Sequence, residues 1–313
     1  MSKKAIRWFP GHMTKGLKKM QQQLKNVDCI LEVHDARVPI SGRYADFSRT
    51  LTGLKPHILV LSKKDLADTK YSESIVSTLN REGLSNIIFT NLKDEQCKDM
   101  KKILPLAKKL ISNSTRYNRT EEESYSLMVI GVPNVGKSSL INRLRSNHLN
   151  KAKAAHVGAV AGITRSLSTR IKISEDPIIY LFDTPGILAP SINDIHAGFK
   201  LALVGCLQDH VVGSDMLADY LLFWLNKNCR FEYVEKLGLP EPNDNVMHVL
   251  TYIAAKFKKT LKIKNYDGRI EITPNFQFAA DYFVSLFRKG ELGPYCLDID
   301  LIETSQDYDI RLA

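Results

Sequence analysis

The sequence predicts an α/β protein in which a mostly parallel sheet, with helices on both faces, is followed by a smaller α-helical domain. Short apolar runs alternate with helical segments up to about residue 185, and a glycine-rich loop follows one of those runs. Beyond Pro190 the chain is rich in Leu and Ala and loses the strand alternation. We therefore expect two domains, at residues 1–190 and 191–313.

Six apolar runs are rich in β-branched and aromatic residues and predict buried strands, at residues 29–34, 57–61, 87–90, 127–131, 168–173 and 178–182. Helical patterning lies between them, at residues 15–26, 72–82, 99–112 and 137–145. Strands that alternate with helices in this way form a parallel sheet. In the second domain, helices are expected within residues 193–228, 244–261 and 274–288.

Composition excludes several classes of protein. The chain has 313 residues, of which 44% are hydrophobic, so it can bury a core and is not a disordered chain. No apolar run approaches the ~20 residues that a membrane span requires. The five cysteines are scattered and form no CxxC pair, which argues against a disulfide framework or a zinc finger.

The net charge of +10 is concentrated in three segments. Residues 1–27 and 134–174 contain no acid, and residues 256–269 carry six basic side chains against Asp267. One such block often only keeps a surface soluble. Three blocks together favour a polyanionic partner, for which RNA is the first choice.

Residues 131–138 read GVPNVGKS, which fits the GxxxxGK[ST] phosphate-loop pattern between a strand and a helix. Lys137 is expected to bridge the β- and γ-phosphates, and Ser138 to supply an oxygen to Mg²⁺. The backbone around the phosphates would come from Asn134, Val135, Gly136 and Ser139. By itself, the pattern could also be an ordinary strand–turn–helix.

A second phosphate-sensing element follows the last predicted strand. Asp183 begins the sequence DTPG, where a carboxylate can hold the Mg²⁺ shell through water, and Gly186 can donate its N–H to the γ-phosphate. Thr164, in the sequence GIT between the two motifs, is the candidate second hydroxyl on Mg²⁺. The ordered set of motifs predicts a nucleoside-triphosphate switch.

The sequence SKKD, at the end of the strand predicted over residues 57–61, predicts guanine recognition. Asp65 can accept hydrogen bonds from guanine N1–H and the 2-amino group, which adenine does not offer. The stem of Lys63 can lie on the base, and Asn91 follows another strand where the backbone can contact the base. The alternative is that Asp65 only caps a helix.

The motif order is circularly permuted, because the base element precedes the phosphate loop, whereas ordinary Ras-like GTPases place it after DTPG. A compact domain tolerates such a permutation because its termini lie close together. The segment after DTPG then leads directly into the C-terminal domain, which could respond to loss of the γ-phosphate.

The sequences WFPGHM, DARVP, SKKD, GVPNVGKSSLIN and DTPGILAP, in this order, make the chain resemble the circularly permuted ribosome-assembly GTPases. The resemblance implies a monomeric GTPase that binds GTP, GDP and Mg²⁺. It also implies binding to the large ribosomal subunit and its rRNA, with hydrolysis stimulated there. For mitochondrial members the expected location is the matrix side of the inner membrane, with peripheral membrane contact.

The same resemblance assigns further roles. Ile187 stands where Ras-like enzymes carry the glutamine that orients water, so the isolated protein should be slow. His12 is the family's proposed substitute, with a structural or RNA-contacting role as the alternative. Asn134 resembles a residue that binds K⁺ in related GTPases. Ser62 replaces the commoner Asn of the base element, and we expect this loss of a bracing amide to lower guanine affinity.

Three other functions fit parts of the sequence. A P-loop ATPase or kinase would leave Asp65 idle. An RNA-binding protein with a vestigial nucleotide site would not need Lys137, Ser138 and Asp183 to be intact. A cytosolic or nucleolar ribosome-assembly GTPase would share every motif and differ only in its compartment.

Overall fold

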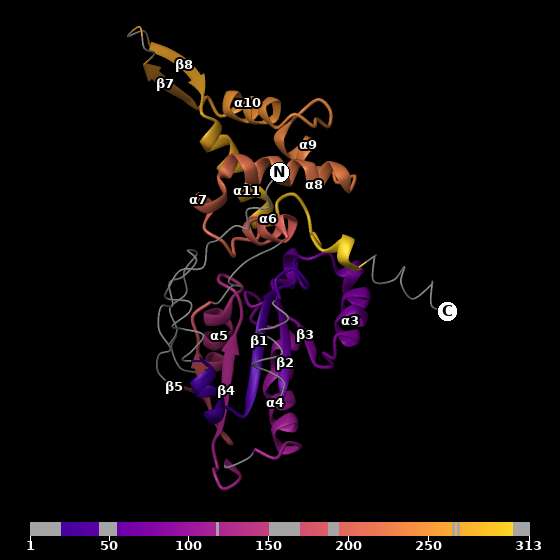
Figure 1. Cartoon of the computed structure of the whole chain (residues 1–313), viewed down its shortest axis with the longest axis vertical. Helices are drawn as coiled ribbons and strands as arrows, with labels where there is room; N and C mark the ends of the chain where they lie inside the picture. The colour runs from indigo at the N-terminus through magenta and orange to yellow at the C-terminus, as the bar shows by residue number, and fades with distance from the viewer. Residues whose placement is uncertain are drawn as a thin grey trace, which may run out of the picture. The chain divides into compact units, whose positions relative to one another are not determined.

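The computed structural model describes residues 20–43, 55–116, 119–149, 170–186, 194–264, 267 and 270–302. The chain divides into two compact units, which Figure 1 shows in sequence colours. Unit 1 comprises Met1–Leu201 and Tyr295–Ala313, and unit 2 comprises Ala202–Pro294. The sequence places the boundary at residue 190; in the structure the division falls after Leu201, and the end of the chain returns to unit 1.

Unit 1 is built on a six-stranded sheet of order β3-β2-β1-β4-β6-β5. Its strands are β1 (Cys29–Asp35), β2 (His57–Ser62), β3 (Ile87–Phe89), β4 (Tyr125–Ile130), β5 (Arg170–Glu175) and β6 (Ile178–Asp183). Neighbouring strands are parallel except β5 and β6. Strand β1 is buried along its whole length, as expected for a parallel sheet that is covered on both faces. The predicted α/β fold class is confirmed.

Helices connect the strands at the predicted places: α3 (Ser72–Arg81), α4 (Ile103–Ser112) and α5 (Lys137–Leu149). The buried side of α3 packs Ile75 and Leu79 against Leu59 and Leu61 of β2. Because β1, β2, β3, β4 and β6 run parallel, the loops that follow them leave from one edge of the sheet. None of the helices in the described ranges has the length and apolarity of a membrane-spanning segment.

Unit 2 contains helices and one β-hairpin. The helices are α7 (Asp209–Val212), α8 (Ser214–Lys227), α9 (Glu232–Leu237), α10 (Val246–Lys256) and α11 (Phe276–Lys289), while α6 (Ile195–Leu203) has residues in both units. The hairpin consists of β7 (Thr260–Lys264) and β8 (Ile270–Pro274). The domain expected to be helical thus also contains a hairpin, whose first strand begins within the helix predicted over residues 244–261. TLKIK and IEITP alternate with period two, a strand pattern that the charge of this segment obscures.

The last described segment, residues 295–302, connects the loops of unit 1. Leu297 donates its N–H to the carbonyl oxygen of Arg37 at 2.8 Å. Asp298 is fully buried and accepts hydrogen bonds from the Ser41 N–H (2.8 Å) and from the Lys200 ammonium group of α6 (3.3 Å). The loop after β1 and the helix that follows DTPG are therefore held by one carboxylate.

Candidate nucleotide-binding site

The loop after β4 has the backbone of a phosphate-binding loop. Gly136 has a φ of +98°, which L side chains rarely adopt. A Cβ at Gly131 would lie 2.2 Å from the carbonyl oxygen of Val33, so close packing on β1 also requires glycine. Asn134 is left-handed with φ +58°, which asparagine tolerates. Helix α5 begins directly after the loop, which therefore lies at the positive end of a helix.

Lys137 lies over this loop. Its side chain is mostly buried, and its ammonium group donates to the carbonyl oxygens of Gly131 (3.2 Å) and Val132 (2.9 Å). A buried ammonium group needs such acceptors. Phosphate oxygens would be stronger acceptors because they are charged. Ser138 and Ser139 follow in the first turn of α5, beside the loop.

The end of β6 supplies a carboxylate that fits a cation. Asp183 is 7% exposed, and its Oδ1 atom is buried without a hydrogen-bond partner in the described part of the chain. Burial raises the pKa of Asp183, while the Lys137 charge and a hydrogen bond with the Ser138 hydroxyl act in the opposite direction. A carboxylate and a hydroxyl together suit Mg²⁺, which keeps several waters and takes few protein oxygens. The structure thus brings Ser138 and Asp183 together.

The residues after Asp183 are fixed against the P-loop strand. Thr184, which the sequence pattern does not single out, is fully buried and donates its hydroxyl to the Val129 carbonyl oxygen at 2.6 Å. A Cβ at Gly186 would lie 2.7 Å from the backbone of Pro133, so glycine alone fits this close approach. The DTPG segment therefore begins in contact with the phosphate loop.

The base element at the end of β2 is bonded directly to the phosphate loop. The hydroxyl of Ser62, a fully buried residue, lies 2.5 Å from the Val135 carbonyl oxygen and 3.0 Å from that of His34. Ser62 and Val135 are 73 positions apart in the chain. The sequence predicts that a serine here loses the bracing amide; in the structure the serine hydroxyl itself lies within hydrogen-bond distance of the phosphate loop. The expected loss of guanine affinity stays a prediction.

Lys63 and Asp65 follow Ser62 in the base element and differ in their surroundings. Lys63 is left-handed (φ +56°) and occupies the N-cap position of the 3₁₀ helix η2 (Lys64–Leu66), without a side-chain capping bond. The alternative role of Asp65 as a helix cap is therefore not supported. The Asp65 side chain is exposed and makes no hydrogen bond or ion pair with another described residue. Its carboxylate is available to a ligand.

Strand β1 supplies an ionised anchor for this element. Asp35 is fully buried and accepts two hydrogen bonds from the Arg37 guanidinium, at 2.9 and 2.8 Å. Its Oδ2 also lies 2.8 Å from Lys63 Nζ. Burial alone would raise the pKa of Asp35, but the charges of Arg37 and Lys63 hold it well below its usual range. The sequence offers only one signal for this role, an acid that directly follows a buried strand.

The loop after β3 closes the same region. A Cβ at Gly136 would lie 3.0 Å from Leu92, so this loop packs on the phosphate loop. The Lys64 N–H donates to the Thr90 carbonyl oxygen at 3.2 Å, which connects the loop to the base element. The Asn91 side chain accepts the Lys93 N–H at 2.9 Å and so shapes the turn. The predicted base-contacting loop is thus adjacent to both other elements.

Cys97 is a residue of this loop that sequence reasoning misses. Burial raises its pKa, but hydrogen bonds from the backbone N–H of Asn91 and from the Thr90 hydroxyl lower it, and the balance is below the usual value. Burial instead raises the pKa of Cys29 and of Cys296 to about 12. The sequence carries no signal for Cys97, because the bonds come from the folded loop.

Three of the site residues predicted from the sequence, His12, Thr164 and Ile187, lie outside the described residues.

A protein-family model described as "50S ribosome-binding GTPase" matches residues 126–258. The match begins in β4, so the base element precedes it in the chain. "Mitochondrial GTPase 1" of Aedes aegypti is 52% identical over 302 residues, which cover 96% of each protein. "Mitochondrial ribosome-associated GTPase 1" of Mus musculus is 51% identical over 300 residues, covering 95% of this chain and 91% of the mouse protein.

A solved structure supports the fold. GNP-bound YlqF from T. maritima aligns with a TM-score of 0.56 and 22% identity, covering 89% of this chain and 95% of YlqF. The predicted resemblance to the circularly permuted GTPases is confirmed. Because the sequence identities exceed one half over almost the whole chain, the protein belongs to the mitochondrial GTPase 1 family and is a circularly permuted GTPase that binds guanine nucleotides.

Proposed function

We propose that this GTPase is an assembly factor for the large subunit of the mitochondrial ribosome, and that the subunit stimulates its GTP hydrolysis. Relatives about half identical to the chain bear the name "mitochondrial ribosome-associated". The observation that carries the nucleotide part is the hydrogen bond between Ser62 and Val135. It joins the base element to the phosphate loop, so that one guanosine triphosphate can reach both.

In the proposed complex, Lys137 bridges the β- and γ-phosphates, and the N–H groups of residues 134–139 surround them. Asp65 accepts the guanine N1–H and 2-amino groups, and the stem of Lys63 supports the base. The exposed Asp65 carboxylate, which has no hydrogen-bond or ion-pair partner among the described residues, supports this role because none of those residues takes up the acceptor capacity that the base would use. Adenine would leave this carboxylate facing an acceptor, which discriminates strongly.

Mg²⁺, when bound, would offset negative charge on the phosphates. Ser138 and Thr164 would contribute hydroxyl ligands, and Asp183 would accept from metal-bound water. The buried Oδ1 atom of Asp183, which has no hydrogen-bond partner among the described residues, supports this assignment. Gly186 would donate its N–H to the γ-phosphate, and Asn134 would be the ligand for K⁺.

Hydrolysis would be slow in the isolated protein, because the aliphatic side chain of Ile187 cannot orient water. We assign the water-positioning role to His12, a residue of the basic N-terminal segment. The ribosomal subunit would stimulate hydrolysis by placing His12 at the nucleotide. Hydrolysis would then depend on binding to the ribosomal particle that is being assembled.

We base the proposed partner on the positive charge of the chain and the proposed location on its mitochondrial relatives. The three basic segments are proposed to contact rRNA, which attracts a protein of net charge +10. We further propose that the protein acts as a monomer on the matrix side of the inner mitochondrial membrane, which it contacts peripherally. The mitochondrial relatives support the compartment.

The test is co-sedimentation with mitochondrial large subunits in the presence of a non-hydrolysable GTP analogue or GDP, with GTP turnover measured in parallel. We expect binding with the analogue, release with GDP, and turnover that rises only with the large subunit. The Lys137→Ala variant, which should not bind GTP, is the matched control. Equal affinity for ATP and GTP would instead identify an ATPase. Absence of turnover with subunits present would identify a vestigial site, and a response to cytosolic subunits alone would place the protein in another compartment.

A further inference from the structure

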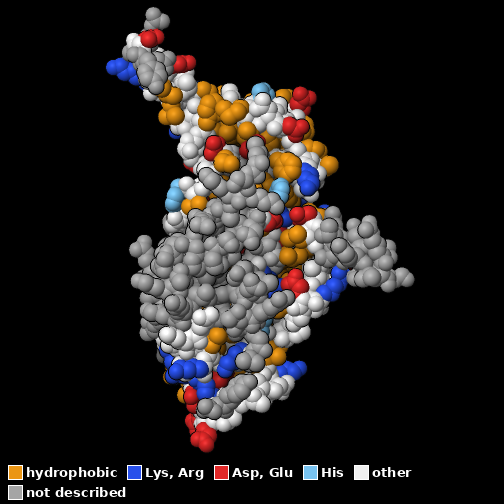
Figure 2. Space-filling model, viewed as in Figure 1, with side chains coloured by type: hydrophobic (Ala, Val, Ile, Leu, Met, Phe, Trp, Pro, Cys, Tyr) orange, Lys and Arg blue, Asp and Glu red, His pale blue; other side chains and the backbone are white. Residues whose placement is uncertain are grey.

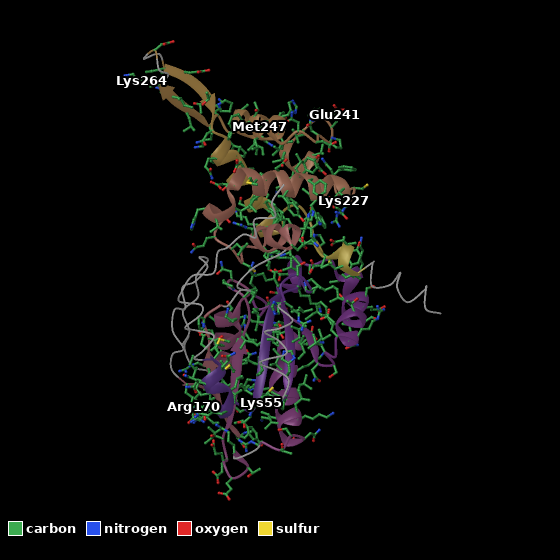
Figure 3. The ribbon with its side chains drawn as sticks, viewed as in Figure 1. Lys55, Arg170, Lys227, Glu241, Met247 and Lys264 are labelled. Atoms are coloured by element: carbon green, nitrogen blue, oxygen red, sulfur yellow. The ribbon has the colours of Figure 1, made fainter. Side chains whose placement is uncertain are left out.

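The β7–β8 hairpin of unit 2 is exposed along most of its length. Its register pairs Lys262 with Ile272 and Lys264 with Ile270, so these four side chains share one face. Glu271 belongs to the other face. Lys264 lies at the outer end of the hairpin (Figure 3). The hairpin therefore has one face on which the charge is only positive.

Aromatic side chains gather where the hairpin leaves the helices. The ring centroid of Phe257, at the end of α10, lies 4.6 Å from that of Tyr282 and 5.9 Å from that of Phe278, both on α11. Phe257 is 38% exposed. The Asn275 N–H donates to the Lys259 carbonyl oxygen at 3.0 Å, which fixes the base of the hairpin beside these rings. Figure 2 shows hydrophobic side chains on the surface over α10.

Four lysines of this region make no ion pair with any carboxylate of the described residues. Within the described ranges, none of the side chains of Lys258, Lys259, Lys262 and Lys264 pairs with a carboxylate. The Lys259 ammonium group instead lies 5.3 Å from the centroid of the Phe278 ring. Cations without a carboxylate partner among the described residues, beside the exposed Phe257 ring, form a combination that suits single-stranded nucleic acid, because a base can stack on the ring while phosphates meet the cations.

We propose that the hairpin and the aromatic cluster at its base bind an unpaired segment of RNA, with a base on Phe257 and phosphates along Lys258, Lys259, Lys262 and Lys264. The inference rests on the proposed function, which makes RNA the partner. In a duplex the faces of the bases are covered by neighbouring base pairs, so they cannot stack on an exposed ring. An unpaired base has a free face that can stack on the ring. An anionic membrane would meet the lysines equally well but would not require the ring cluster.

The test uses the full chain and fluorescence anisotropy with a labelled single-stranded oligouridine of about 12 nucleotides, a length within the usual site size. A duplex RNA of equal length and vesicles containing about 20% anionic phospholipid serve as the competing ligands, the charge content being that of an ordinary anionic surface. We expect the single strand to bind about tenfold more tightly than the duplex. We expect Phe257→Ala to weaken binding of the single strand about tenfold. Phe231→Ala is the matched control, because Phe231 is similarly exposed (42%) and lies at the start of α9.

Charge is tested separately with Lys262→Gln and Lys264→Gln. Each change should reduce the slope of log affinity against log salt by about 0.7. Phe257→Leu, which keeps an apolar side chain at the cluster, guards against unfolding: it should retain the thermal transition of the natural chain and still lose affinity. Equal binding of duplex and single strand, preferential binding to vesicles, or full affinity in both Phe257 variants would overturn the proposal. None of these outcomes affects subunit-stimulated GTP turnover, whose absence would instead refute the proposed function.

Discussion

The ammonium group of Lys63 lies 2.8 Å from the Oδ2 atom of Asp35, so the lysine of the base element is held by a carboxylate from the adjacent strand. Asp35 is fully buried and also binds Arg37 through two hydrogen bonds. Strand β1 lies between β2 and β4 in the sheet. Strand β1 lies between the strand that precedes the base element and the strand that precedes the phosphate loop, and it positions the base element through Asp35.

Asp35→Ala should destabilise the protein strongly, because it removes the carboxylate that binds the buried Arg37 guanidinium through two hydrogen bonds. We expect a loss of about 3–5 kcal/mol in the free energy of unfolding, measured by urea denaturation without nucleotide. The pKa of Asp35 is held low in the folded state, so its stabilising contribution is complete above about pH 4 and is lost as the pH falls further. Lys63→Met is the control: it keeps the Asp35–Arg37 pair and should weaken GTP and GDP binding alike. Equal stability of both variants would refute the anchor role.

Ser62→Ala should lower the affinity for GDP about fivefold to tenfold, because it removes a buried hydrogen bond worth about 1 kcal/mol and frees the phosphate loop from the base element. Titration with a fluorescent GDP analogue measures the change. Ser62→Asn supplies another donor at the same place and should retain more affinity than alanine. If alanine binds as tightly as serine, the brace does not contribute to binding.

Asp183→Asn should make nucleotide affinity insensitive to Mg²⁺, whereas chelation of Mg²⁺ should weaken binding to the natural chain. Burial raises the pKa of Asp183, so protonation should begin at a higher pH than for an exposed carboxyl group. Mg²⁺ affinity should therefore begin to decline at a higher pH than it would with an exposed carboxylate ligand. A decline confined to the range of an ordinary carboxylate, about pH 4, would contradict this assignment.

Cys97 should react with iodoacetamide at neutral pH several times faster than Cys29 or Cys296. Its pKa lies below the usual thiol value, whereas burial raises the pKa of the other two to about 12, so Cys97 has the largest thiolate fraction of these three. Mass spectrometry of peptides from briefly alkylated protein measures the three rates. Guanine nucleotide should slow the reaction, because Cys97 belongs to the loop adjacent to the base element. If addition of GTP leaves the alkylation rate of Cys97 unchanged, this loop is not part of the nucleotide site.

His12→Ala should leave GTP binding intact and remove the subunit-stimulated turnover that the proposed function predicts, because the proposed role of His12 is to position water for hydrolysis. Nucleotide titration and phosphate release, each with and without subunits, measure the two effects. Normal stimulated turnover in the variant would discard this role. Loss of subunit binding itself would point to the alternative, contact with RNA.

The sequence alone determines the elements whose signals are local. The GVPNVGKS loop, the DTPG segment and the alternation of apolar strands with helices each depend on neighbouring residues, and all were found at the predicted places within the described part of the chain. The permuted order of the motifs is likewise a property of the sequence. The basic β7–β8 hairpin was not predicted from the sequence because its period-two pattern is short and carries several charges.

Only the tertiary structure decides the contacts between distant segments. The bond from Ser62 to Val135, the anchor of Lys63 on Asp35, and the return of Asp298 to Ser41 and Lys200 join positions that no local pattern relates. Each depends on which strands are neighbours and on how closely their loops approach. The sequence thus specifies the chemical groups of the nucleotide site, whereas parallel strand pairing brings those groups to one edge of the sheet.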